Sequence, residues 1–439
     1  MHQLGAFITK KGHRIVKSDR TAPCSKACSA EVVAMPYGEP NAKAPQINKG
    51  TIYAVHLTVK STTQADHRAH CAFFKKRHCM DLFSITDIAS RFDSIAWTGV
   101  GLRSELLPTL PATTLLHAGP PLHNAPPHAI LNSACQAMVF EGMACSMAEA
   151  ASLLEAGHVQ LAPAQDFGVV TPLAQVVSAS MPMARLEGKQ TTRLAPFIEA
   201  GVPALRFGST MPDAPARLRM MGLFAQHALA PALAQKPVTM APIVLAGLTH
   251  GQDCHAQTDA ANTALTAAVQ LDTADQSVLR SYPAFVLPIV MAACSVWLHD
   301  SGSDIVAAAG NGLEFGFKRR GFSGWHVVQA TPPQGILLPG HTWQNALGAI
   351  GDSAVVDFAG LGGQALVFCP DLAKAYAAHL PADLHAQRKA VLDKATGNVR
   401  INGMPTHPIL VNLAILGQGP DSGLIGRGIY HTPPNLFTV

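Results

Sequence analysis

An acidic residue and a histidine lie two positions apart in the segment Gly251-Gln252-Asp253-Cys254-His255. A carboxylate can orient an imidazole so that the ring acts as a general base, and the same two side chains can ligate a metal. We predict that His255 is a catalytic base that Asp253 orients, and we include Glu314 as a third catalytic residue. We expect no metal and no organic cofactor.

The stretch from 311 to 363 alternates charged residues with glycines, a pattern that neither a simple helix nor a simple strand needs. Glycine accepts positive φ and lets backbone approach a ligand, and a helix that begins at such a turn has free N–H groups for an anion. A basic triplet that begins at Lys318 adds positive charge. The stretch therefore predicts a site for a small anionic substrate, although tight turns and helix capping would explain each short motif as well.

His117 joins this site because it ends a predicted strand, where ligands bind in open α/β sheets. We expect six residues to converge on one cleft, namely His117, Asp253, His255, Glu314, Lys318 and Asp352. The predicted substrate-binding or anion-binding residues are His117, Gly119, Asn311, Lys318, Gly351, Asp352, Ser353, Asp357, Gly360, Gly362 and Gly363.

Composition excludes several classes of protein. The net charge of +4 is too small to indicate nucleic-acid binding, and the odd number of cysteines, nine, does not predict a secreted disulfide framework. The longest apolar run, at 282–298, contains two prolines and is shorter than a typical membrane span of about 20 residues. We predict a cytoplasmic protein that binds neither nucleic acid nor membrane.

The chain divides by pattern into a tail and a folded part. Residues 1–79 are basic and aperiodic, which predicts a disordered extension, and Met80 is an alternative start. Histidines and cysteines at 67–79 could form a zinc site, but their spacing matches no known finger.

From Thr113 onward, strands alternate with helices. TTLLH, QAMVFEG, VQLAP and QALVF read as strands, and Ser146 with Glu149 predicts a capping box at a helix start. The fold class that we predict is α/β (mixed α+β) and multidomain, with α/β segments on either side of a largely helical middle domain. The boundaries are 80–195 for the first α/β domain, 196–305 for the helical domain and 306–439 for the second α/β domain.

Several spaced motifs resemble the YlbE/AllG family, to which a subunit of bacterial oxamate carbamoyltransferase belongs. They are TLLHAGPP, AMVFEGMA, VSASMPM, HGQDCH, NGLEFG, GDSAVVDFAGLGG and GLIGRGIYHTPP, in one order from Thr113 to the C-terminus. The resemblance implies a transferase subunit that moves a carbamoyl group between oxalurate and phosphate in purine- or allantoin-derived nitrogen catabolism. It also implies companion subunits and a small anionic substrate such as carbamoyl phosphate or oxamate.

Three departures from the family pattern leave an alternative open. Gln252 stands where the family has an acid, Gln257 stands where it has an arginine, and the segment 164–167 lacks the histidines that relatives carry. A guanidinium clamps a carboxylate or phosphate through two parallel hydrogen bonds, which Gln257 cannot replace with charge. The alternative is a non-catalytic or divergent subunit that acts as a structural partner in a hetero-oligomer. A GDS-type hydrolase and a dinucleotide-binding protein are less favoured, because their accompanying motifs are missing.

Overall fold

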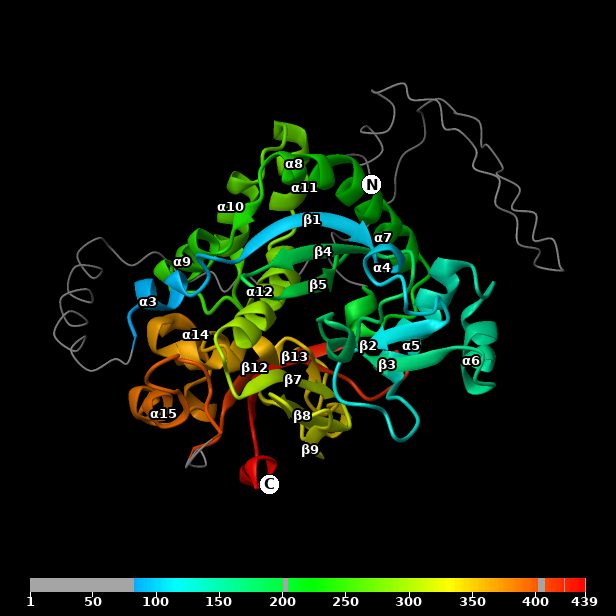
Figure 1. Cartoon of the computed structure of the whole chain (residues 1–439). Coiled ribbons are helices and arrows are strands. Elements are labelled where there is room, and N and C mark those ends of the chain that lie inside the picture. The colour runs from blue at the N-terminus through cyan, green and yellow to red at the C-terminus, as the bar shows by residue number, and fades with distance from the viewer. Residues whose placement is uncertain (1–82, 200–203, 402–406, 422, 439) are drawn as a thin grey trace, which may run out of the picture. The chain divides into compact units, whose positions relative to one another are not determined.

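The computed structural model describes residues 83–199, 204–401, 407–421 and 423–438. The predicted tail at 1–79, its histidine–cysteine cluster and the alternative start at Met80 lie outside these residues. Within the described ranges, helices alternate with four sheets, so the predicted mixed α/β fold class is confirmed (Figure 1).

The first sheet has the strand order β5-β4-β1-β6, and each neighbouring pair is antiparallel. Helix α12 (Val286–Asp300) packs against β4 and β5 and buries an almost entirely apolar surface there. The strands are β1 (Ala96–Leu102), β4 (Pro182–Glu187), β5 (Thr192–Pro196) and β6 (Val238–Thr239).

A parallel pair of strands, β2 (Thr114–His117) and β3 (Gln160–Pro163), forms the second sheet. Helices α5 (His128–Glu141) and α6 (Met147–Glu155) connect the two strands, and the Ser146 side chain caps α6 as its sequence predicts. The prediction of a strand at QAMVFEG is wrong, because these residues form the end of α5. Apolar periodicity does not distinguish a buried helix from a buried strand over so short a run.

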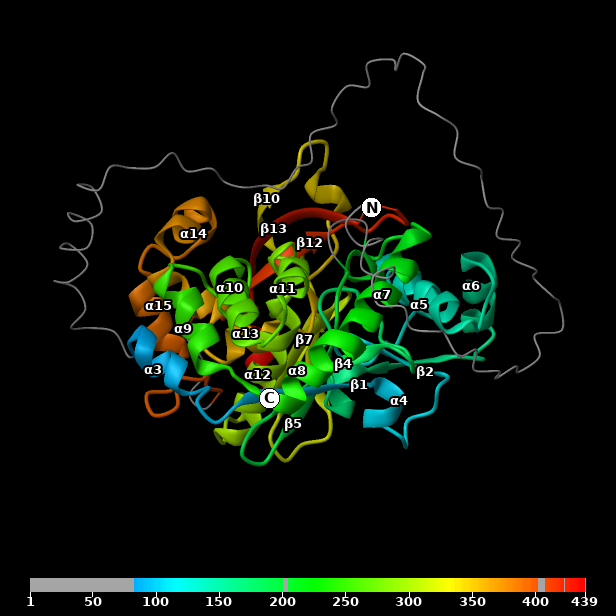
Figure 2. The same cartoon turned by 90° about the horizontal axis from the view of Figure 1, so that it is seen from above.

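Helices dominate the middle of the chain, as the sequence predicts. Figures 1 and 2 show α7 to α11 gathered on one side of the sheet that contains β1. The helices of this part are α7 (Asp213–Phe224), η4 (Ala225–Leu229), α8 (Ala230–Gln235), α9 (Ala241–Thr249), α10 (Asp259–Ala268), α11 (Thr273–Arg280) and α12 (Val286–Asp300).

Two antiparallel sheets follow, with the orders β11-β7-β8-β9 and β10-β13-β12. The prediction of a strand at QALVF is wrong, because 362–368 form the 3-10 helix η6, whose Gln364 amide donates to the Leu410 carbonyl of β12. The elements are β7 (Ile305–Asn311), β8 (Glu314–Arg319), β9 (Trp325–Gln329), β10 (Gln334–Leu337), β11 (Ile350–Gly351), α13 (Ala354–Phe358), η6 (Gly362–Phe368), α14 (Pro370–Ala375), α15 (Leu384–Val391), β12 (Leu410–Leu416) and β13 (Leu424–His431).

The largest apolar core draws side chains from every folded segment that the sequence predicts. It includes Ile88 near the start of the described chain, Leu229 and Ile289 from the helical middle, and Val356 and Phe437 from the last part. The remaining described elements are α3 (Ile85–Ser90), α4 (Arg103–Leu106), η2 (Ala164–Phe167), η3 (Leu205–Phe207), η5 (Trp343–Asn345), η7 (Ala377–His379) and η8 (Pro434–Phe437). The domain boundaries stay a prediction.

Candidate functional site

Asp352 joins three distant segments through one buried carboxylate. Its Oδ1 accepts hydrogen bonds from the Gly119 N–H at 3.0 Å and from the Gln165 side-chain amide at 2.9 Å. Its Oδ2 accepts from the Thr171 N–H at 2.9 Å. Burial raises the pKa of Asp352 to about 7, although the three donors act in the opposite direction.

The loop that follows His117 lies against the turn at Asn311. Gly119 has φ +92°, and a Cβ there would lie 2.5 Å from the Asn311 backbone nitrogen, so glycine is required. The Asn311 side chain donates to the Pro120 carbonyl at 3.1 Å. His117 is fully buried, its Nδ1 lies 2.8 Å from the Ala118 carbonyl oxygen, and burial lowers the pKa of the ring to about 4. This histidine is therefore neutral near pH 7.

A second buried cluster contains an ion pair between His255 and Asp357. The Nδ1 atom of His255 lies 2.8 Å from Oδ2 of Asp357, and the two side chains are 5% and 0% exposed. Burial alone would lower the pKa of His255, but the Asp357 carboxylate outweighs this effect, so the pKa is raised. Asp357 was predicted to bind a ligand anion, but it is itself the anion that pairs with this histidine.

Asp253 has a different role from the one its spacing predicts. Its Oδ1 accepts from the backbone N–H groups of His255 at 3.1 Å and Gln257 at 2.9 Å, and its Oδ2 accepts from the Asn412 side chain at 2.8 Å. Asp253 therefore shapes the loop, while Asp357 holds the imidazole. We predicted that Asp253 would orient the imidazole, but the carboxylate that contacts it is that of Asp357, which lies about a hundred positions further along the chain.

The glycine-rich turn at 360–363 binds an anion that belongs to the protein. Gly363 donates its N–H to the Asp357 carboxylate at 2.7 Å, and Gly362 donates to the Asp253 carbonyl at 3.0 Å. Gly360 donates to the Asp357 carbonyl at 3.1 Å. Because these three N–H groups have acceptors within the fold, the turn does not offer them to a ligand.

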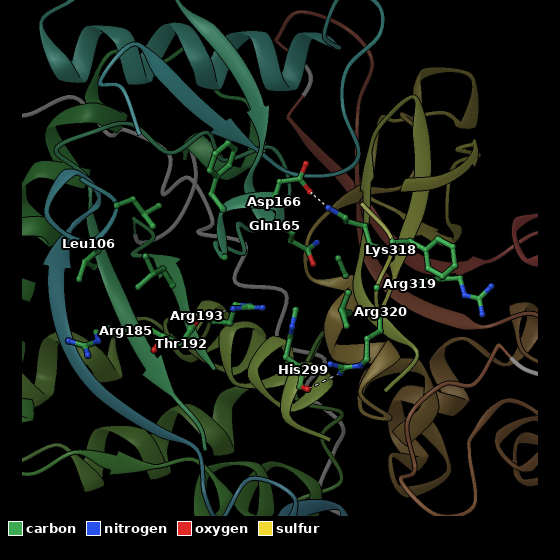
Figure 3. A pocket seen from close by; sticks show the side chains of 18 of the residues that line it. Leu106, Gln165, Asp166, Arg185, Thr192, Arg193, His299, Lys318, Arg319 and Arg320 are labelled. Carbon is green, nitrogen blue, oxygen red and sulfur yellow. Dashed lines mark hydrogen bonds and ion pairs between the residues drawn. The ribbon is translucent and has the colours of Figure 1, made fainter. Parts of the chain in front are cut away.

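A cavity of about 860 Å³ lies between β5, β8 and η2, and basic side chains outnumber acidic ones in its wall. We call it the cationic cavity. Figure 3 shows Lys318 in contact with Asp166 at one end, while Arg193 and His299 point into the space between the strands. Arg319 points away from that space. The charged lining residues are Glu105, Asp166, Arg185, Arg193, Lys318, Arg319 and Arg320.

The basic side chains of the cationic cavity perturb one another. Burial lowers the pKa of Arg193 to about 10, which leaves the guanidinium charged at neutral pH. Burial, followed by repulsion from Arg193 and Arg320, lowers the pKa of His299 to about 4. Burial is the main reason that His299 is neutral near pH 7, and the two arginines add to this effect while Asp300 opposes it.

The predicted single cleft is not what the structure contains. Lys318 lines the cationic cavity, whereas Asn311 and Glu314 line a second cavity of about 840 Å³. Gly351 belongs to β11, and Ser353 precedes α13 with its side chain buried. The predicted residues outside the linings of these two cavities are His117, Gly119, Gly351, Asp352, Ser353, Asp253, His255, Asp357, Gly360, Gly362 and Gly363.

Sequence reasoning missed four residues on which these sites depend: Gln165, Arg193, His299 and Asn412. Arg193 belongs to the short strand β5, and His299 lies near the end of the apolar helix α12, so no motif marks either residue. Among the described residues, no group of three or more histidine, cysteine or acidic side chains is placed to hold a metal ion. Across the same residues, no helix has both the length and the apolar character that a membrane crossing requires.

The fold and these clusters define an α/β protein with buried carboxylate networks beside a cationic cavity. The family model described as "Oxamate carbamoyltransferase subunit AllG" matches residues 159–353, a range that includes Arg193, Lys318 and Asp352. The Escherichia coli (strain K12) protein of the same name is 29% identical over 301 residues, which cover 63% of this chain and 72% of that protein. Over these ranges the chain is similar to the AllG-like family.

Two further proteins extend this comparison. "Uncharacterized protein YahG" of Escherichia coli (strain K12) is 27% identical over 373 residues, covering 76% of this chain and 79% of that protein. The crystal structure of a conserved protein of unknown function from Enterococcus faecalis V583 has a TM-score of 0.68 at 22% identity. That likeness covers 81% of this chain and 97% of the other chain, and it shows that the fold is shared.

Proposed function

We propose that this protein is a subunit of an oxamate carbamoyltransferase-like enzyme, which exchanges a carbamoyl group between oxalurate and phosphate. The name of its Escherichia coli relative supports this assignment. The observation that carries the proposal is the cationic cavity, where five arginine and lysine side chains line the wall beside two carboxylates. Small-molecule sites commonly have volumes of about 300–1,000 Å³, and this cavity is large enough for two small anions together.

The reaction explains why such a cavity is useful. A phosphate oxygen forms a bond to the carbamoyl carbon of oxalurate, and the bond from that carbon to the amide nitrogen breaks. The proton of hydrogen phosphate is transferred to the departing nitrogen, so the products are carbamoyl phosphate and oxamate. Because both reactants are anions, cationic side chains are needed to bring them together and to stabilise negative charge as it shifts.

Arg193 and Arg320 are the strongest candidates for contact with the anions. The Arg193 guanidinium donates to the Ser295 hydroxyl at 3.2 Å and to the Thr192 carbonyl at 2.8 Å. Arg320 donates to backbone carbonyls, including that of Ser303 at 2.9 Å. These neutral acceptors orient each side chain without forming an ion pair with it, although Asp300 acts electrostatically on Arg193. We propose that the charge of both side chains is available to a phosphate or carboxylate.

The proposed proton-transfer groups lie outside the lining of the cationic cavity. His255 remains the proposed base, with Asp357 as its partner, but neither residue lines the cationic cavity. We therefore propose that this subunit contributes the anion site and that transfer takes place in the assembled hetero-oligomer. The second candidate, a purely structural subunit, is favoured by one observation, namely that the glycine-turn N–H groups are all bonded within the fold.

The test is an assay of phosphate-dependent cleavage of oxalurate, with oxamate as the measured product. The protein is assayed alone and together with the proposed companion subunits. We expect activity in the complex, and we expect Arg193→Gln to lower kcat/KM by at least about tenfold, the effect of losing one charged hydrogen bond to substrate.

Arg280→Gln is the matched control, because Arg280 is an exposed residue of α11 and does not line the cavity. It should leave kcat/KM unchanged. If the complex is active and Arg193→Gln has no effect, the subunit is structural and the cavity is not the substrate site. If no combination of subunits cleaves oxalurate, the proposed reaction is wrong.

A further inference from the structure

One acidic side chain in the cationic cavity is placed where a ligand anion would bind. The Oδ1 atom of Asp166 accepts a hydrogen bond from the Lys318 ammonium at 2.9 Å and another from the Trp325 indole N–H at 3.0 Å. Figure 3 shows the ion pair at one end of the cavity. The Asp166 and Lys318 side chains are 29% and 17% exposed, so both are accessible from the cavity.

The segment that carries Asp166 does not depend on this ion pair for its position. The neighbouring Gln165 amide donates to the Ala308 carbonyl at 3.1 Å and to the buried Asp352 carboxylate at 2.9 Å. Gly168, at φ +73°, ends the 3-10 turn, and the Val169 N–H bonds back to the Ala164 carbonyl at 3.1 Å. The backbone of η2 is therefore anchored while the Asp166 side chain can exchange its partners.

Lys318 differs from Arg193 and Arg320 in its hydrogen-bond partner, whereas Arg185, which also lines the cavity, forms an ion pair with Glu187. The hydrogen bonds of Arg193 and Arg320 go to hydroxyl and carbonyl oxygens, which are neutral. The ammonium of Lys318 has a carboxylate as its partner instead. An incoming anion that uses Lys318 must therefore compete with a tethered anion that is already in hydrogen-bonding contact.

We propose that Asp166 is an internal competitor for the anion site, and that an oxyanion ligand binds Lys318 by displacing the Asp166 carboxylate. This inference rests on the proposed function, since it takes the cationic cavity as the substrate site. Partly exposed ion pairs contribute little free energy, so the exchange is feasible for a ligand that also contacts Arg193 and Arg320. Competition by a tethered carboxylate weakens the binding of every anion and selects ligands with several negative oxygens.

Trp325 gives the displacement an optical signal. Its indole N–H loses the Asp166 acceptor when the carboxylate moves, and indole fluorescence responds to such a change. The chain has four tryptophans, and Trp97 is fully buried in the core. Trp325→Phe therefore identifies how much of any fluorescence change comes from the cavity.

The experiment measures the binding of inorganic phosphate to the full-length protein by calorimetry and by tryptophan fluorescence, at matched ionic strength. Asp166→Asn keeps the shape of the side chain and removes its charge, so we expect phosphate affinity to rise about three- to tenfold. The fluorescence change on binding should largely disappear in this variant and in Trp325→Phe. Glu155→Gln, which removes an exposed carboxylate of α6 outside the cavity, should change neither quantity.

The outcomes separate this inference from the proposed function. If wild-type protein binds phosphate and Asp166→Asn binds it equally or more weakly, Asp166 is not a competitor, while the anion site stands. A rise in affinity that Glu155→Gln reproduces would also overturn the inference, because it would reflect net charge alone. If no variant binds phosphate, both the inference and the proposed anion site are wrong.

Discussion

The histidine–aspartate pair, His255 and Asp357, and the cationic cavity differ in how their charged side chains are partnered. Asp357 is fully buried, and its oxygens meet two backbone N–H groups, those of Gly363 and Asn412, together with the imidazole of His255. Arg193 and Arg320 in the cavity contact only neutral oxygens among the hydrogen bonds described for them. In the first region the carboxylates have hydrogen-bond partners from the protein itself. In the second region the arginine and lysine side chains outnumber the carboxylates that line the cavity.

This difference separates residues that hold the fold from residues that can hold a ligand. A buried charge whose partners are all provided by the protein stabilises one arrangement of the chain, and removing one partner is costly. Excess charge of one sign at an accessible wall is instead compensated by solvent or by a ligand. The glycine turn at 360–363 belongs to the first region, and its N–H groups bond within the fold. Its sequence motif therefore indicates packing in this protein rather than substrate binding.

Gly362→Ala should have the largest effect of the substitutions that test the structural role of the His255–Asp357 pair. Gly362 has φ +52°, and a Cβ would lie 2.2 Å from Oδ1 of Asp357 and 3.2 Å from Nδ1 of His255. The new methyl group must displace the buried pair, so we expect the free energy of unfolding to fall by about 3 kcal/mol or more. The midpoint of urea denaturation measures this loss.

Gly142→Ala is the matched control for backbone strain. Gly142 ends α5 at φ +73°, and a Cβ there would meet nothing within 4 Å. Its substitution should cost only the strain of a left-handed residue, about 1–2 kcal/mol. If both alanine variants lower stability equally, the buried pair does not depend on the close approach of Gly362.

We next predict the pH dependence that Asp352 gives to stability. The folded protein raises the pKa of Asp352 from the ordinary value of 3.8 to about 7, so between these values it keeps a proton that the unfolded chain releases. The contribution of this group to the free energy of unfolding therefore falls as pH rises from 4 to 7, by up to about 1.4 kcal/mol per pH unit. Asp352→Asn has no such group, so the stability of the wild type minus that of the variant should decrease across this range. Parallel stability curves would contradict the prediction.

The sequence predicted elements well where one local signal determined them. Strand β2 and the start of α6 at Ser146 appear where their patterns place them. The errors at 136–142 and 364–368 both concern short, mostly buried apolar runs, where period 2 and period 3.6 cannot be told apart. At 364–368 the side chain of Gln364 bonds to β12. This contact is made with a distant strand, so no local sequence pattern predicts it.

The sequence predicted the candidate site only in part, for a similar reason. Motif spacing identified Lys318, His255 and Asp352 as chemically notable residues, yet it could not say which of their partners come from elsewhere in the chain. Arg193 and His299 line the cationic cavity only because the fold brings β5 and α12 close to β8. The N–H groups at 360–363 looked available from the sequence, because it does not show that Gly363 bonds to the Asp357 carboxylate and that Gly360 and Gly362 bond to backbone carbonyls.

The measurement that tests the central claim most directly is phosphate binding by three proteins, wild type, Arg193→Gln and His255→Gln, at matched ionic strength. We predict that Arg193→Gln weakens binding at least about tenfold while its melting temperature changes little, since the lost group faces the cavity. His255→Gln should lower the melting temperature and leave the dissociation constant of the folded protein nearly unchanged. If His255→Gln abolishes phosphate binding and Arg193→Gln does not, the anion site lies at the histidine–aspartate pair and our division of the molecule is wrong.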